Sequence, residues 1–169
     1  GAATKSAQVP FHVWLPGAMA APTPVSAYLH SATMVKASVL LVAVSSPALA
    51  STGSWKVVGA ALGIASMLWG AVGALRHRDA KLILAWGTVS QLGLMMTLFT
   101  LGTAKATFAG VAILFAHALF KATLFLVVGE VDIRTGTRDI ASLRGLWRSM
   151  PIACAAATAA GLSMAGVPP

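Results

Sequence analysis

Residues 106–130 read ATFAGVAILFAHALFKATLFLVVGE, and this stretch decides the class of protein to which the chain belongs. It is long and apolar enough to form a helix across the hydrocarbon core of a bilayer. His117 and Lys121 are four residues apart near its middle, so a helix places both on one face. Lys121 is then too deep for its side chain to reach water easily. A buried cation inside a membrane helix is the first indication of function.

Lysines occur in two other apolar stretches. Lys36 follows His30 by six positions, and Lys5 stands beside a break at Pro10. An ammonium at the centre of a membrane helix costs about 2.5–3.5 kcal/mol, so three of them amount to on the order of 9 kcal/mol against insertion. Residues kept at that cost usually line a water-filled interior and move charge. The pattern therefore indicates ion transport.

The composition agrees with a membrane protein. Hydrophobic residues make up 57% of the chain and charged residues only 9%, which is far too apolar for a soluble domain. The net charge of +8 does not indicate nucleic-acid binding, because most basic residues gather in two connections between apolar segments. The positive-inside rule predicts that these loops, residues 76–81 and 131–149, are cytoplasmic in a multi-pass protein of the cell membrane. Their basic residues are Arg76, Arg78, Lys81, Arg134, Arg138, Arg144 and Arg148.

The hydropathy pattern predicts an all-α, polytopic membrane helix bundle of about six transmembrane segments. We expect residues 1–169 to form a single membrane-embedded unit, an interior piece of a longer protein. The first segment is broken at Pro10, and such breaks inside membranes are tolerated where they face water or protein. The expected segments are 1–15, 24–46, 56–75, 80–102, 106–130 and a last helix that begins near Pro151.

Five residues are candidates for proton transfer: Lys5, His30, Lys36, His117 and Lys121. Each has an alternative interpretation. Lys121 could be a neutral or paired lysine that holds two helices in register, His30 a satisfied core histidine, and Lys5 a lysine near a helix end that reaches toward water. The acids Asp79, Glu130, Asp132 and Asp139 all fall at helix ends or in loops, so a structural partner for Lys121 would have to come from outside this chain.

Polar residues near these groups are candidates for holding water, although each is more often a helix–helix hydrogen-bonding group. They are Ser6, Gln8, His12, Thr33, Ser90 and Gln91. Sodium prefers oxygen ligands, and the predicted segments carry no embedded carboxylate, so the ion exchanged with these lysines is expected to be a proton. We expect no metal site and no cofactor, and Cys154 is expected to be a structural thiol.

Several motifs resemble the antiporter-like subunits of respiratory complex I and of the Mrp multisubunit sodium/proton antiporters. They are the stretches 5–16, 21–37, 85–93 and 117–122, and the stretch 136–140 is closer to the large, A-type subunit of the Mrp antiporter. The resemblance covers nearly the whole chain. It implies two inverted five-helix repeats, each with a broken helix, and a polar axis of lysines, histidines and water halfway across the membrane.

The resemblance also implies roles for individual residues. Lys5 matches the lysine at the first broken helix, Lys121 matches the central lysine, and Pro10 and Pro168 match the two helix breaks. His30 and Lys36 match the helix that follows the first broken helix. In the family, a glutamate that pairs with the position of Lys5 and a charged residue after the second break lie outside this stretch. Where the complex I relative tends to have a further histidine, this chain has Ile113.

Three functions fit these observations. The first is a proton-translocating subunit, not an enzyme, of a multisubunit sodium/proton antiporter, with other membrane subunits as partners, protons and sodium as substrates, and lipid around it. The second is the proton-pumping subunit of an NADH–quinone oxidoreductase or membrane hydrogenase. The chain has no flavin, iron–sulfur or dinucleotide motif, so we expect no redox step here in either case. A non-conducting scaffold is the third, and it would leave the intramembrane lysines unexplained.

Overall fold

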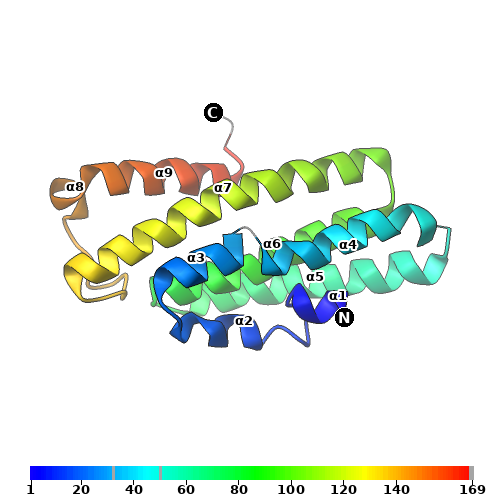
Figure 1. Cartoon of the computed structure of the whole chain (residues 1–169), viewed down its shortest axis with the longest axis horizontal. Helices are drawn as coiled ribbons and strands as arrows, with labels where there is room; N and C mark the ends of the chain where they lie inside the picture. The colour runs from blue at the N-terminus through cyan, green and yellow to red at the C-terminus, as the bar shows by residue number, and fades with distance from the viewer. Residues whose placement is uncertain (32, 50, 168–169) are drawn as a thin grey trace.

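The computed structural model describes residues 1–31, 33–49 and 51–167, which form helices lying side by side (Figure 1). No β-strand occurs within these ranges, and the expected all-α helix bundle is confirmed. In chain order the elements are α1 Ala2–Lys5, α2 Trp14–Gly17, the 3-10 turn η1 Ala18–Ala20, α3 Thr23–Ser31, α4 Met34–Leu49, α5 Gly53–Arg76, α6 Ala80–Leu101, α7 Ala104–Thr135, α8 Leu146–Ser149 and α9 Pro151–Ala165.

Among the described residues, four stretches are long and apolar enough to cross a membrane: Thr23–Leu49, α5, α6 and α7. The helix α9 is apolar but shorter, with 15 residues, and the first expected segment consists of two four-residue helices. Thus four of the about six expected segments have membrane-spanning length within the part of the chain that the structure describes. The helix α7 also extends beyond the predicted 106–130, because it ends where Gly136 adopts a left-handed conformation with φ of 68°.

The helices α5 and α6 pack in very close contact. A Cβ added to Gly70 would lie 2.4 Å from the backbone nitrogen of Ser90, and one added to Gly63 would lie 2.7 Å from the carbonyl oxygen of Gly93. Small residues let two membrane helices approach until their backbones touch, which gains dispersion contacts that lipid does not provide. The backbones of α5 and α6 therefore lie too close together for larger side chains at Gly63 and Gly70.

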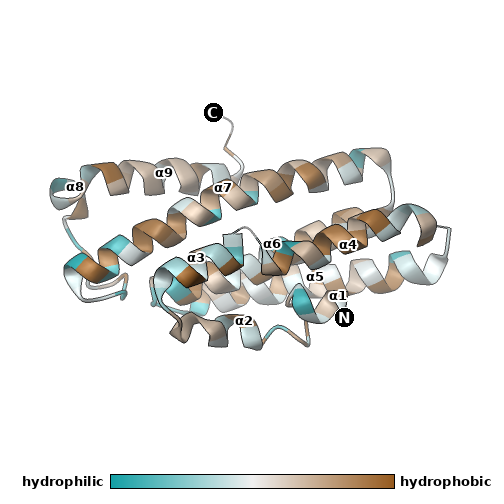
Figure 2. Cartoon of the chain, viewed as in Figure 1, coloured by the Kyte–Doolittle hydropathy of each residue, from teal (hydrophilic) through white to brown (hydrophobic). Residues whose placement is uncertain are grey.

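The helix α6 has neighbours on several sides. Its residues Val89 and Leu92 belong to a core cluster with Val35 and Val39 of α4, and nearer its start Leu84 packs in a second cluster with Phe125 of α7. The outer faces of the bundle remain apolar (Figure 2), as expected of helices that face lipid or other membrane helices. Hence side chains of α4 and α7 pack against α6, while α3 packs mainly against α7.

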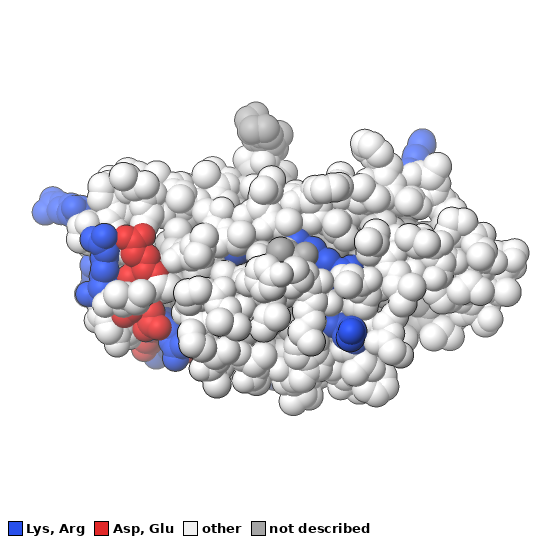
Figure 3. All heavy atoms as spheres, viewed as in Figure 1, with Lys and Arg blue, Asp and Glu red and all other residues white. Residues whose placement is uncertain are grey.

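The two basic connections lie together at one end of the bundle. The amide of Ala80 donates to the carbonyl of Arg138 over 2.9 Å, and the amide of Ile140 donates to that of Arg78 over 3.0 Å. Arg138 Nε also lies 3.3 Å from Asp79 Oδ2, and Figure 3 shows the acidic and many of the basic side chains gathered at this end. The start of α6 at Ala80 agrees with the expected segment 80–102, so the loop expected at 76–81 ends before Lys81. The expected start of the second loop was wrong, because α7 continues to Thr135.

A break between α1 and α2 surrounds Pro10, as the sequence predicts. Its backbone is held by α5: the amide of Val9 donates to Ser66 Oγ over 2.8 Å. A hydrogen bond also joins the two helices on either side of the break, since Trp14 Nε1 on α2 donates to the carbonyl of Thr4 on α1 over 2.9 Å. The second predicted break, at Pro168, lies outside the described residues.

Candidate functional site

Three lysines are buried in the interior of the bundle. Lys121 on α7 is 0% exposed, Lys81 on α6 is 1% exposed and Lys36 on α4 is 6% exposed. Each ammonium donates to a backbone carbonyl: Lys121 Nζ to Leu84 over 2.9 Å, Lys36 Nζ to Ser31, and Lys81 Nζ to Ala21. Within the described ranges none of the three has a carboxylate at ion-pairing distance. The interior therefore holds several basic groups that have no direct ion-pair partner among the described residues.

Two histidines are buried in the same region. The ring of His30 stacks on Phe125 at a centroid distance of 5.5 Å, and that of His117 meets Phe120 edge-on at 5.3 Å. Both nitrogens of each imidazole are buried and find no hydrogen-bond partner among the residues described. Buried polar atoms are almost always satisfied, by protein or by ordered water. These two rings are therefore polar sites inside an apolar bundle, at which a water molecule can bind.

The five buried groups form one cluster, defined here as His30, Lys36, Lys81, His117 and Lys121. His30 lies within the range of electrostatic interaction with Lys121 and Lys81. His117 lies within that range of Lys121, Lys36 and His30. The members come from four helices, α3, α4, α6 and α7. Because like charges repel in a medium of low dielectric constant, the cluster cannot hold all its protons at once. It is therefore suited to taking up and passing on protons.

The sequence identified four members of this cluster but not Lys81, which it assigned to a basic connection with Arg76 and Arg78. The structure corrects this assignment, because Lys81 is in the first turn of α6 and points into the bundle. A helical signal was available: positions 81, 85, 88 and 92 follow helical spacing, and all four are buried. Lys81 therefore belongs to the inner face of α6 rather than to the loop.

Lys5 is not brought into the cluster. It lies at the end of α1 and is exposed on the surface of this chain, where it lines a cavity of about 670 Å³ with Ala37 and Ser38. The nearby Ser6 and Gln8 are buried; Ser6 Oγ donates to the carbonyl of Ala2 over 2.7 Å, and Gln8 Oε1 has no partner in the described part of the chain. A proton-transfer role of Lys5 stays a prediction.

The other candidate water-holding residues are spread over the bundle. Thr33, Ser90 and Gln91 are half-buried, and Thr33 Oγ1 makes a long contact of 3.5 Å with the carbonyl of Tyr28. His12 is half-buried beside α5, where it accepts a hydrogen bond from Trp69. Their role in holding water stays a prediction as well.

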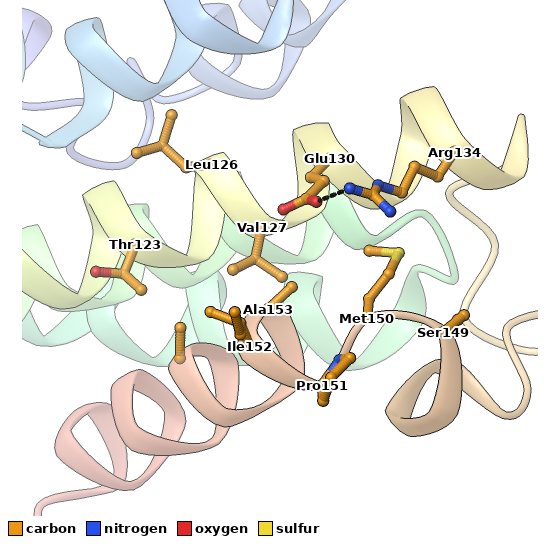
Figure 4. A pocket seen from close by; sticks show the side chains of 11 residues that line it. Thr123, Leu126, Val127, Glu130, Arg134, Ser149, Met150, Pro151, Ile152 and Ala153 are labelled. Carbon is orange, nitrogen blue, oxygen red and sulfur yellow. Dashed lines mark ion pairs between the residues drawn. The ribbon is translucent and has the colours of Figure 1, made fainter.

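One cavity connects the cluster with the charged end of the bundle. It has a volume of about 700 Å³, and Lys81 lines it together with Glu130, Asp132 and Arg138. A neighbouring cavity of about 530 Å³ lies between α7 and the start of α9, with the ion pair between Glu130 and Arg134 at one end (Figure 4). Its lining among the described residues contains no lysine or histidine, so of these two cavities the first is the one that reaches a member of the cluster.

The donor set does not suit a metal ion. No group of three or more His, Cys, Asp or Glu side chains comes together in the part of the chain that the structure describes. Ammonium groups would repel a cation at the cluster. The chemistry that the cluster can carry is proton transfer between nitrogen atoms and water.

Known proteins are similar to this chain in both sequence and fold. The chain is 49% identical to the A-type subunit of the Na(+)/H(+) antiporter of Alkalihalophilus pseudofirmus, with 100% of this chain and 23% of the relative covered. It is 51% identical to a probable K(+)/H(+) antiporter subunit, of type A/B, from Rhizobium meliloti, with 99% of this chain and 17% of that relative covered. The chain thus spans about a fifth of the length of these curated relatives.

Solved structures agree. An Mrp complex from Dietzia sp. matches with a TM-score of 0.94 at 46% identity, over 99% of this chain and 18% of that one. The membrane-bound sulfane sulfur reductase, an archaeal respiratory complex, matches with a TM-score of 0.88 at 28% identity, over 99% of this chain and 35% of that one. The model of the transmembrane family of NADH:quinone oxidoreductases and Mrp antiporters covers residues 1–169, and this chain belongs to that family.

Proposed function

We propose that this chain is the proton-translocating part of the large, A-type subunit of a multisubunit sodium/proton antiporter in the bacterial cell membrane. It carries protons along the cluster of His30, Lys36, Lys81, His117 and Lys121, with water between the side chains. It forms one membrane-embedded unit of a longer polypeptide, which acts as part of a transporter and not as an enzyme. Other membrane subunits complete the complex.

The burial of Lys121 is the observation that carries this proposal. A lysine that is 0% exposed in a membrane helix, with only a backbone carbonyl as its partner among the described residues, makes insertion unfavourable by about 2.5–3.5 kcal/mol. A purely structural lysine would be expected to pair with a carboxylate, which lowers that cost. A lysine that gives up and regains its proton during a transport cycle needs no permanent partner.

The arrangement of the remaining groups supports a path that leads from the charged end of the bundle into the cluster. The cavity beside Lys81 lies at the end with the basic connections, where protons would exchange with the cytoplasm. The carboxylates of Glu130 and Asp132 at its wall can attract protons toward Lys81. His30 then offers imidazole nitrogens near both Lys81 and Lys121, and His117 offers its own near Lys121 and Lys36, where water can complete the relay.

Sodium is the cation proposed for the whole complex, since relatives named as A-type subunits of Na(+)/H(+) antiporters are 46–49% identical to this chain. The Rhizobium relative is named for potassium, so potassium is the second candidate. The similarity to the sulfane sulfur reductase keeps a redox-driven pump as an alternative, at the lower identity of 28%. In each case this part of the protein would move the protons, and the cation would bind elsewhere.

Lys121→Ala in the full complex tests this proposal. In everted membrane vesicles, a pH gradient is imposed and sodium or potassium is added, and the loss of the gradient is followed with a fluorescent dye. We expect Lys121→Ala to abolish cation-coupled proton release without preventing assembly, which a native gel would show. Exchange in wild-type vesicles without any respiratory substrate would separate an antiporter from a redox-driven pump.

Lys105→Ala is the matched control, because Lys105 is on the same helix α7 but exposed. It should exchange cations at the wild-type rate. Wild-type exchange by an assembled Lys121→Ala complex would contradict the proposal. Equal loss in both variants would point to general damage to α7 rather than to a role of Lys121.

A further inference from the structure

A second group of titratable and aromatic side chains lies outside the cluster, beside the first helix break. Trp69 Nε1 on α5 donates to His12 Nε2 over 3.1 Å, and the two rings meet at 76°. An indole nitrogen can only donate a hydrogen bond, so the imidazole nitrogen that receives it must carry no proton. His12 is therefore neutral in this arrangement, with its proton on Nδ1.

The group is held in place by close packing around Trp86 of α6. The indole of Trp86 lies between two imidazoles, 5.3 Å from the ring of His12 and 5.8 Å from that of His77, which stacks on it. A Cβ added to Gly73 would lie 2.4 Å from the Trp86 ring, so only a glycine leaves room for the indole there. His77 is fixed too, because its Nδ1 lies 2.7 Å from the carbonyl oxygen of Gly73 and must donate to it.

The proton on His12 Nδ1 has a specific consequence. This nitrogen is buried and finds no acceptor among the residues that the structure describes, and the same holds for Trp86 Nε1. A buried N–H group without a partner is costly, so native proteins supply an acceptor, frequently an ordered water. The position of His12 between Pro10 and Trp14 puts this donor at the break between α1 and α2.

We propose that Trp69 is a positioning residue that holds His12 in the neutral form with its proton on Nδ1, and that His12 thereby binds a water molecule at the helix break. His12 then acts as a fixed donor rather than as a proton carrier, because protonation of Nε2 would remove the acceptor of the Trp69 hydrogen bond. The consequence for transport rests on the proposed function, whereas the protonation state of His12 can be measured without it.

Nitrogen-15 solid-state NMR of the full complex with labelled histidine tests the first part. We expect a His12 signal, identified by its loss in His12→Gln, with a protonated Nδ1 and an unprotonated Nε2 that accepts a hydrogen bond. Magnetisation transfer from water to the Nδ1 proton should be detectable. In Trp69→Phe, which removes the donor but keeps an aromatic ring, this signature should change to mixed tautomers.

Trp55→Phe is the matched control. Trp55 is also on α5, and its Nε1 donates over 3.4 Å to Ser46 Oγ, a group that does not titrate. The His12 signal should stay unchanged in this variant. A wild-type His12 that carries its proton on Nε2, or a Trp69→Phe complex with the wild-type signal, would overturn the inference. If His12 carries its proton on Nδ1 but no magnetisation transfer from water to that proton is detected, the proposal that His12 binds a water molecule is overturned.

Transport gives a second, separable readout. Loss of one hydrogen bond predicts that Trp69→Phe slows cation-coupled proton exchange by about two- to tenfold, while Trp55→Phe does not. If Trp69→Phe changes the His12 signal but exchange stays at the wild-type rate, the part of the inference that concerns transport is overturned. Failure of the proposed function itself would appear in Lys121→Ala and would leave the NMR signature intact.

Discussion

Lys121 on α7 and Leu84 on α6 are joined by a 2.9 Å hydrogen bond from the lysine ammonium to the leucine carbonyl oxygen. The same carbonyl accepts the hydroxyl of Thr88, also at 2.9 Å. Gly87 lies beside them, and a Cβ at this position would be 3.1 Å from Lys121 Nζ. The absence of a side chain at Gly87 is what lets the ammonium lie against the backbone of α6.

A larger residue at position 87 should therefore displace the ammonium. We expect Gly87→Leu to lower cation-coupled proton exchange in everted vesicles by at least about tenfold, equivalent to about 1.4 kcal/mol. Gly87→Ala should have a smaller effect, because the flexible end of Lys121 can move by a few tenths of an ångström. Gly161→Ala is the control, since no atom lies within 4 Å of its added Cβ. Wild-type exchange by a Gly87→Leu complex would show that proton transport does not require the Lys121 ammonium to lie against the backbone of α6.

Lys81 is predicted to be as important for transport as the lysines that the sequence singled out. Lys81→Met keeps most of the length and apolar character of the side chain but removes the charge and the donor to Ala21. We expect a decrease in exchange of about tenfold or more, with assembly retained on a native gel. Lys105→Met, at an exposed position of α7, should exchange normally. Normal rates in Lys81→Met would remove it from the proposed path.

Asp79 should stabilise the start of α6 mainly as a helix cap. Its Oδ1 accepts from the amides of Lys81 at 2.8 Å and Leu82 at 3.2 Å, and its Oδ2 pairs with Arg138. Asp79→Ala loses both interactions and should cost about 0.5–2 kcal/mol, whereas Asp79→Asn keeps the cap and loses only a surface ion pair worth about 0–1 kcal/mol. Hydrogen exchange of the Lys81 and Leu82 amides should therefore speed up more in the alanine variant. The reverse order would contradict the assignment of the cap.

The positive-inside rule predicts the orientation of the bundle. In a background without other reactive cysteines, Arg144→Cys should react with a membrane-impermeant maleimide only in everted vesicles. Lys105→Cys lies near the start of α7, at the opposite end of that helix, and should react in intact cells. The reversed pattern, Arg144→Cys labelled in intact cells and Lys105→Cys only in everted vesicles, would refute the orientation. Labelling of both positions from one side would refute the crossing of α7 between them, for which that helix is long enough.

Much of the fold was predictable from local pattern. Apolar stretches of membrane-spanning length predict helices because the backbone must satisfy its hydrogen bonds within lipid, and α5, α6 and α7 follow that rule. The break at Pro10 was predictable for a similar reason, since proline removes a backbone donor. His117 and Lys121 were predicted to share a face of one helix, and both are buried on α7. Spacing along a single helix was enough in each case.

The sequence by itself determined the membrane class, the long helices and four members of the cluster, because hydropathy and helical spacing depend only on neighbouring residues. The tertiary structure alone decided that Lys81 joins them and that Lys5 does not. The ammonium of Lys81 donates to the carbonyl of Ala21, sixty residues earlier in the chain, and only folding brings that carbonyl to α6. Whether a lysine at a helix end turns inward or outward depends on such distant acceptors, which local sequence does not specify.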